Sequence, residues 1–176
     1  VSATVNGGNL YTPYVVKGIT DASTNSVIYE NKKQKKRKII SEETSAQVRY
    51  ALESVVALGT GRNAYIENYR VGGKTGTAQK VKDGHYIVGN YILSFIGFMP
   101  ADEPEIVVYA AVDNAKNAPQ YGGTVSAPIV RNIMMSSIDI LGIKERKKGI
   151  LKEYIWTDSK YYVVPNVIGK SLKEAQ

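Results

Sequence analysis

The segment Gly72-Gly73-Lys74-Thr75-Gly76-Thr77-Ala78-Gln79 holds the residues of this chain that are best suited to chemistry. One ammonium group stands beside two hydroxyl groups, and these are donors that suit a carboxylate or a phosphate. A phosphate-binding P-loop would need glycine five positions before Gly73, where the chain has Asn68, and would need a helix afterwards. The segment is therefore interpreted as a strand.

Side chains alternate between the two faces of a strand. One face of this strand then carries Gly72, Lys74, Gly76 and Ala78, and the other carries Thr75, Thr77 and Gln79. The first face has one ammonium group among residues with almost no side chain, so another element can approach it closely. The second face supplies hydroxyl groups beside the cation, and we expect the strand to bind a carboxylate.

Other kinds of catalytic site have little support. The chain has no cysteine, which excludes structural zinc fingers, disulfide frameworks and cysteine nucleophiles. A histidine-based metal site or a Ser-His-Asp triad would depend on His85 alone, which we interpret as an exposed loop residue. We predict no metal site and no cofactor. Arg62 is interpreted as a structural arginine near the entry to the strand.

Two short patterns that carry catalytic serines in some enzymes, Ser-x-x-Lys and Ser-x-Asn, yield no candidate nucleophile in this chain. No serine of the chain is followed three positions later by lysine, so the Ser-x-x-Lys pattern is absent. Ser23-Thr24-Asn25 satisfies the pattern Ser-x-Asn, but serine and asparagine are common turn formers. This tripeptide is therefore interpreted as a turn between two short strands.

The net charge is +7, and six basic residues lie within residues 31–38. A solvated loop is our leading interpretation of this run, and contact with an anionic polymer or a membrane surface is the alternative. The run has no interleaved aromatic residue on which bases could stack, so we expect no nucleic-acid partner.

The pattern of apolar residues predicts an α+β fold with an antiparallel sheet flanked by helices. Short connections favour antiparallel neighbours, because parallel strands need a long crossover. A helix capped by Ser41 should run to Gly59, and a second, capped by Ser126, should pack through Ile129, Ile133, Ile138 and Leu141. Strands are expected at residues 13–20, 26–30, 69–81, 86–99 and 105–113.

The chain is predicted to divide into three parts, at residues 1–142, 143–160 and 161–176. Residues 143–160 are polar and basic, as in a linker. The last part contains a capping box at Ser171-Leu172-Lys173-Glu174, which predicts the start of a helix. Because both ends of the chain interrupt expected elements, we expect a fragment of a longer protein.

Lys74-Thr75-Gly76 on a strand resembles the third signature motif of penicillin-binding proteins and serine β-lactamases. The surrounding segments strengthen the likeness, so that residues 1–142 resemble the C-terminal part of the transpeptidase domain of class B penicillin-binding proteins. These segments are Gly59-Thr60-Gly61-Arg62, residues 94–101 and Tyr121-Gly122-Gly123. Residues 161–176 resemble the start of a PASTA repeat, a small wall-associated module.

The resemblance implies a peptidoglycan D,D-transpeptidase that works through an acyl-serine intermediate and binds β-lactams. It implies catalytic roles for Lys74 and Thr77, whose N–H would form half of the oxyanion hole. It implies substrate binding by Thr75, Gly76, Thr77 and Gln79. The alternatives are a serine β-lactamase, and a non-catalytic β-lactam sensor or wall-binding protein.

The implied partners are D-Ala-D-Ala stem peptides, β-lactams, the N-terminal half of the same protein and the wall-synthesis machinery. The implied location is the cell membrane, with an extracytoplasmic catalytic domain and an anchor upstream of residue 1. The nucleophilic serine would also lie upstream, because the chain lacks Ser-x-x-Lys.

Overall fold

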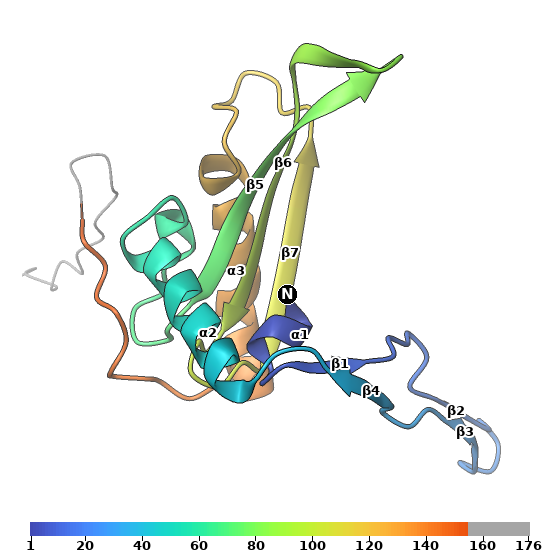
Figure 1. Cartoon of the computed structure of the whole chain (residues 1–176). Coiled ribbons are helices and arrows are strands. Elements are labelled where there is room, and N and C mark those ends of the chain that lie inside the picture. The colour runs from blue at the N-terminus through green and yellow to red at the C-terminus, as the bar shows by residue number, and fades with distance from the viewer. Residues whose placement is uncertain (155–176) are drawn as a thin grey trace, which may run out of the picture.

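The computed structural model describes residues 1–154 of the 176-residue chain (Figure 1). The elements in chain order are α1 (Ser2–Val5), β1 (Asn9–Tyr11), β2 (Gly18–Thr20), β3 (Val27–Glu30), β4 (Lys35–Lys38), α2 (Glu42–Ala57), a 3-10 helix (Arg62–Ala64), β5 (Gly72–Lys82), β6 (His85–Met99), β7 (Ile106–Asp113) and α3 (Gly122–Leu141). Among these helices, none combines the length and the apolar character needed to cross a bilayer.

The central element is an antiparallel sheet in the order β5-β6-β7, as the short connections predicted. Its register places Lys74 of β5 opposite Ile96 of β6, which in turn lies opposite Tyr109 of β7. In the described sheet β5 is an edge strand, so its outer edge pairs with no other strand. The predicted α+β fold is confirmed.

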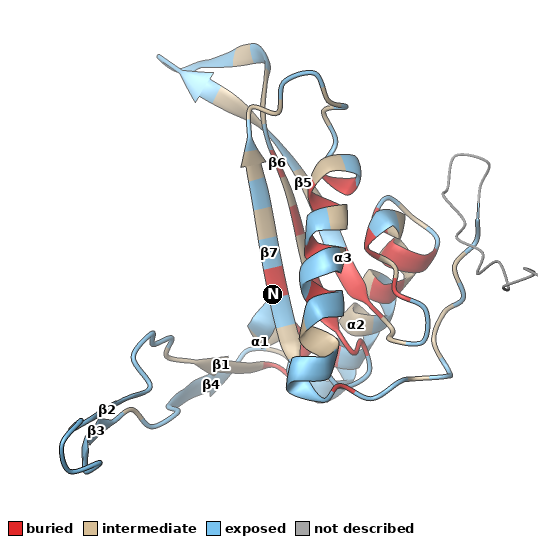
Figure 2. Ribbon diagram, turned by 180° about the vertical axis from the view of Figure 1, so that it is seen from behind, coloured by how far each residue is buried: buried red, intermediate tan, exposed pale blue. Residues whose placement is uncertain are grey.

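The main core lies between one face of this sheet and α3 (Figure 2). Phe95 of β6 packs there with Val130 and Met134 of α3, and all three side chains are fully buried. On the other face Phe98 packs against Val5 of α1 and Leu52 of α2. Helix α3 thus covers one face of the sheet, and α1 and α2 pack on one end of the opposite face.

Helix α3 differs from the prediction in its start and in its buried face. It begins at Gly122, and Ser126 is not its cap but a buried residue whose hydroxyl donates to the Leu93 carbonyl at 2.8 Å. The buried face of α3 begins with small residues and continues at helical spacing with two larger apolar ones. These residues are Gly123, Ser126, Ala127, Val130 and Met134. Ile129, Ile133 and Leu141, which we expected on the packed face, are exposed, because the helix turns its small residues toward the sheet instead. Ile138, the fourth residue of the predicted face, is partly buried against the core.

Residues 9–39 form an arm that extends away from the sheet and helices (Figures 1 and 2). The basic run was expected to be a loop, but Lys35–Lys38 form strand β4, which pairs with β1. Lysine is poorly represented in strands, so propensity gave no sign of this pairing. Strands β2 and β3 lie within the two predicted segments but are shorter than predicted.

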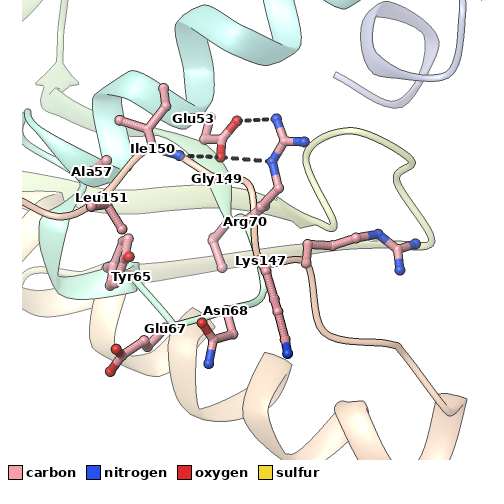
Figure 3. A pocket seen from close by; sticks show the side chains of 12 residues that line it. Glu53, Ala57, Tyr65, Glu67, Asn68, Arg70, Lys147, Gly149, Ile150 and Leu151 are labelled. Atoms are coloured by element: carbon pink, nitrogen blue, oxygen red, sulfur yellow. Dashed lines mark hydrogen bonds and ion pairs between the residues drawn. The ribbon is translucent and has the colours of Figure 1, made fainter.

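The chain that follows α3 packs back onto the body of the domain around a buried carboxylate (Figure 3). Glu53 of α2 is 2% exposed and accepts hydrogen bonds from Arg70 at 3.0 and 2.8 Å and from the Ile150 N–H at 3.2 Å. The hydrogen bond to Glu53 raises the pKa of Arg70. The backbone N–H of Arg146 donates to the backbone carbonyl of Asn68 at 2.6 Å. Residues 143–154 of the predicted linker therefore contact the domain, whereas the predicted PASTA-like segment lies outside the described residues.

Replacing Glu53 by glutamine is expected to lower the free energy of unfolding of the full-length protein by roughly 2 kcal/mol. The change removes the charge that compensates the partly buried guanidinium group of Arg70. The loss stays below that of a fully buried pair because Arg70 also contacts Asp102 at 3.4 Å. Urea unfolding of the two proteins measures the difference in the free energy of unfolding. The control is Lys80→Gln, which breaks the exposed pair with Asp113 and should cost less than about 1 kcal/mol; equal losses would contradict the prediction.

Candidate active site

An open groove of about 670 Å³ lies beside β5, between that strand, the end of α2 and the start of α3. Thr75 and Thr77 line it from the strand, as their predicted shared face requires. Thr60 and Asn63, which follow α2, also line the groove, as does Tyr121, the residue before α3. The structure thus brings two of the predicted substrate-binding residues together with residues of the other motifs.

Lys74 lies on the opposite face of β5, but its ammonium group reaches the threonine side. Its Nζ donates to the Thr75 carbonyl at 3.1 Å and to the Thr75 hydroxyl at 3.2 Å. The hydroxyl of Thr60 lies 3.4 Å from the hydroxyl of Thr75. An ammonium group and two hydroxyl groups therefore lie within a few ångströms of each other at the edge of the sheet, where a carboxylate needs such donors.

The first turn of α3 sits directly on this region because its glycines have no side chains. A Cβ atom at Gly122 would collide with the Ser94 carbonyl and would lie 2.7 Å from the Gly76 carbonyl. A Cβ atom at Gly123 would collide with the Thr60 carbonyl and would lie 3.2 Å from Cγ2 of Thr75. The helix N-terminus, which carries a partial positive charge, is thereby brought to the groove.

Gly76 and Gln79 have local roles in the strand. A Cβ atom at Gly76 would collide with the hydroxyl of Ser94 on β6, so the residue allows close packing on the face that Lys74 occupies. The Gln79 side-chain amide donates to the Ile87 carbonyl at 3.3 Å, within the β5–β6 hairpin. Neither residue lines the groove with Thr75 and Thr77.

Arg62 lines the groove but also closes the end of α2. Its guanidinium group donates to the Gly59 carbonyl at 3.1 Å and to the Leu58 carbonyl at 2.9 Å. A cation at the carboxyl end of a helix is favourable, which agrees with the structural role that we expected. Asn63 donates to the Gly123 carbonyl at 2.9 Å and so ties this turn to α3.

Thr60 was not singled out from the sequence. Gly59-Thr60-Gly61 indicates the end of a helix, and that pattern does not reveal which face the threonine takes. The signal that could have identified it is its place between two glycines within a motif of the resembled family. His85, the first residue of β6, is exposed, and residues 1–154 contain no cluster of three or more acidic or histidine side chains arranged for a metal ion.

Ser23, the serine of the only Ser-x-Asn match, lies in the turn between β2 and β3, on the arm. Its N–H and hydroxyl both donate to the Asp21 carboxylate, as does the N–H of Thr24. These hydrogen bonds, with that of the Ser23 hydroxyl the largest contribution, lower the pKa of Asp21 to about 2. The tripeptide is a hydrogen-bonded turn, as we interpreted it.

Replacing Ser23 by alanine is therefore expected to leave acylation of the full-length protein by penicillin unchanged. The substitution removes one hydrogen bond in an exposed turn and no group of the groove. Rates of labelling by a fluorescent penicillin, compared between the two proteins, measure the effect. A large decrease in the rate would mean that this serine, and not one outside residues 1–176, belongs to the catalytic motif.

The motifs and the fold agree with what comparison to known proteins finds. The sequence model of the penicillin-binding protein transpeptidase domain matches residues 1–135. Stage V sporulation protein D of Bacillus subtilis (strain 168) is 60% identical over 176 residues, which are 100% of this chain and 27% of that protein. The peptidoglycan D,D-transpeptidase FtsI homolog of Mesostigma viride is 33% identical over 147 residues, 77% of this chain and 25% of that protein.

Solved structures give the same result. Penicillin-binding protein 3 of Mycobacterium tuberculosis, complexed with ampicillin, superposes with a TM-score of 0.72 at 26% identity, over 87% of this chain and 36% of that one. The transpeptidase domain of penicillin-binding protein 3 from Burkholderia pseudomallei gives a TM-score of 0.65 at 31% identity, over 82% and 41%. The chain spans about a quarter of the length of the two curated relatives. It belongs to the penicillin-binding protein transpeptidase domain family.

Proposed function

We propose that the full-length protein is a serine-type peptidoglycan D,D-transpeptidase and that this chain supplies its substrate-carboxylate site. The observation that carries the proposal is the groove beside β5, which Thr60, Thr75, Thr77 and the start of α3 line. The ammonium group of Lys74 lies 3.2 Å from the Thr75 hydroxyl at this groove. Hydroxyl groups beside a cation and a helix N-terminus suit the terminal carboxylate of a peptide.

In the proposed reaction a serine from outside residues 1–176 attacks the carbonyl carbon between the two D-alanines of a stem peptide. The serine oxygen forms an ester with that carbon, the peptide bond breaks, and the terminal D-alanine leaves with the serine proton on its amine. An amine of a neighbouring stem peptide then attacks the ester, which restores the serine and forms the cross-link. A β-lactam acylates the same serine, and its opened ring stays attached.

The residues of β5 take separate roles in this proposal. Thr75 and Thr77 donate hydrogen bonds to the substrate carboxylate, and Lys74 supplies the positive charge beside it. The Thr77 N–H donates to the developing oxyanion, a contact whose loss typically costs on the order of 100- to 1000-fold in rate. Gly76 keeps the strand close to β6 and α3. Gln79, two residues after Thr77 on β5, would contact a substrate that extends along the strand beyond the groove.

The proposal includes partners and a location. Its substrates are D-Ala-D-Ala stem peptides, its inhibitors are β-lactams, and the N-terminal part of the same protein completes the site. Two Mycobacterium tuberculosis structures similar to this chain hold ampicillin and aztreonam, which supports β-lactam binding. We place the catalytic domain outside the cytoplasm, attached to the cell membrane, where it works with other wall-synthesis proteins.

Labelling with penicillin tests this function. The full-length protein is treated with a fluorescent penicillin and digested, and the labelled peptide is identified by mass spectrometry. We expect one labelled serine, followed three positions later by lysine and lying outside residues 1–176. A label on a serine of this chain, or no label on the folded full-length protein, would contradict the proposal. Cross-linking of a stem-peptide donor to an acceptor amine separates the enzyme from a β-lactam sensor.

A further inference from the structure

The arm, residues 9–39, carries most of the excess positive charge of the chain. It holds seven basic and two acidic side chains, so it contributes five of the seven net positive charges. The basic residues are Lys17, Lys32, Lys33, Lys35, Lys36, Arg37 and Lys38. Every residue of β2, β3 and β4 is exposed, and the arm extends away from the body of the domain (Figure 2).

These charges are not neutralised within the part of the chain that the structure describes. Among residues 1–154 none of the seven forms an ion pair with an acidic side chain. The ammonium group of Lys33 lies 4.2 Å from the centre of the Tyr11 ring, a contact that leaves its charge in place. Within the described residues the arm therefore presents a cationic surface that no acidic side chain compensates.

The same arm also exposes an unusual amount of apolar surface. Eight large apolar residues are exposed: Tyr14, Val15, Val16, Ile19, Val27, Ile28, Tyr29 and Ile39. Strands β2 and β3 form a two-stranded ribbon that buries none of its residues, and such a ribbon is marginally stable by itself. Clustered exposed apolar residues mark interaction sites. The arm is thus suited to a partner that is both anionic and able to take up apolar side chains.

We propose that the arm docks on an anionic lipid surface. Its lysines would contact lipid phosphates, and the valine, isoleucine and tyrosine side chains around β2 and β3 would enter the boundary between headgroups and acyl chains. A soluble polyanion or a nucleic acid would neutralise the cations but would leave Val15 and Ile28 in water. The proposal does not depend on the catalytic function, because the arm contributes no residue to the groove.

The test uses a fluorophore whose emission reports burial in lipid. Because this chain has no cysteine, Val15→Cys gives one labelling site within it, once any cysteines elsewhere in the full-length protein are replaced by serine. A nitrobenzoxadiazole label is attached there, and the protein, carried in phosphatidylcholine nanodiscs, is mixed with vesicles. The matched control is Val88→Cys, at a residue that is 88% exposed on the β5–β6 hairpin, outside the arm.

We expect vesicles that contain phosphatidylglycerol to shift the emission of the label at position 15 to the blue, and vesicles of phosphatidylcholine alone to leave it unchanged. The label at position 88 should respond to neither. Replacing Lys35, Lys36, Arg37 and Lys38 by glutamine should weaken vesicle binding by a factor of roughly 600, because each of the four basic residues near such a surface contributes about a fivefold factor. Val27→Ser with Ile28→Ser should weaken it as well.

Three results would overturn the proposal. One is an unchanged emission at position 15 with phosphatidylglycerol vesicles. Another is an equal response at position 88, which would mean adsorption of the whole protein. The third is that soluble poly(glycerol phosphate) or RNA binds the protein as tightly as the vesicles do, and that the Val27 and Ile28 substitutions do not weaken this binding. That result would mean that the arm binds a polyanion. Penicillin labelling of each variant shows that the catalytic domain remains folded.

Discussion

Replacing Lys74 by alanine in the full-length protein is expected to slow acylation by penicillin on the order of 100- to 1000-fold, with little change in stability. The side chain is exposed, and within residues 1–154 its ammonium group makes two hydrogen bonds, both to Thr75. Its removal deletes the positive charge beside the threonine hydroxyls. It leaves no cavity in the core.

The matched control is Lys80→Ala on the same strand. Lys80 is also a basic residue of β5, but its ammonium group pairs with Asp113 at 2.9 Å, whereas that of Lys74 contacts the groove residue Thr75. The second-order rate constant of acylation should fall for Lys74→Ala and not for Lys80→Ala. It is measured from the amount of fluorescent penicillin bound in samples quenched at successive times. An unchanged rate in the Lys74 variant would remove this residue from the catalytic site.

The two faces of β5 explain how one short motif supports both charge and hydrogen bonding. Alternation separates Lys74 from Thr75, yet the long lysine side chain brings its ammonium group to 3.2 Å from the Thr75 hydroxyl. A shorter cation could not make this contact. Glycine at positions 72 and 76 leaves the two same-face neighbours of Lys74 on the strand without side chains, and Gly72 also gives room to the ring of Phe98.

The sheet was predictable from the sequence because its strands are long, apolar and joined by short connections. The ends of the three predicted segments agree with those of β5, β6 and β7 to within three residues. The shared face of Thr75 and Thr77 was predictable for the same reason, since alternation holds along any regular strand.

Contacts between distant segments were not predictable in this way. Thr60 approaches Thr75 because Gly123 lets α3 pack on the turn after α2, and no local pattern encodes that three-way contact. The predicted start of α3 was wrong because serine is a favoured helix cap. In the structure the Ser126 hydroxyl donates a hydrogen bond to a buried carbonyl of β6 instead. The pairing of Lys35–Lys38 with β1 was missed because it depends on register between two short segments.

Replacing Gly122 by alanine is expected to disturb both the groove and the fold. The added methyl group would collide with the Ser94 carbonyl and approach the Gly76 carbonyl, and backbone atoms cannot rotate away as side chains do. The start of α3 must then move away from β5 and β6. Overpacking of this kind costs about 1–3 kcal/mol of stability. A shift of a site residue by about 1 Å can slow a reaction on the order of 100-fold, which is the decrease in acylation that we expect.

A second variant separates displacement of the groove from a general loss of stability. Val130→Ala removes a fully buried side chain from the middle of α3 and should cost about 2 kcal/mol, because it leaves a cavity against the sheet. Its acylation rate should stay near that of the unmodified protein at a temperature where both variants are folded. If Val130→Ala slows acylation as much as Gly122→Ala does, the contact of Gly122 with the strand carbonyls has no special role. If only Gly122→Ala slows it, the close approach of α3 to Gly76 holds Thr75 and Thr77 in position for the substrate.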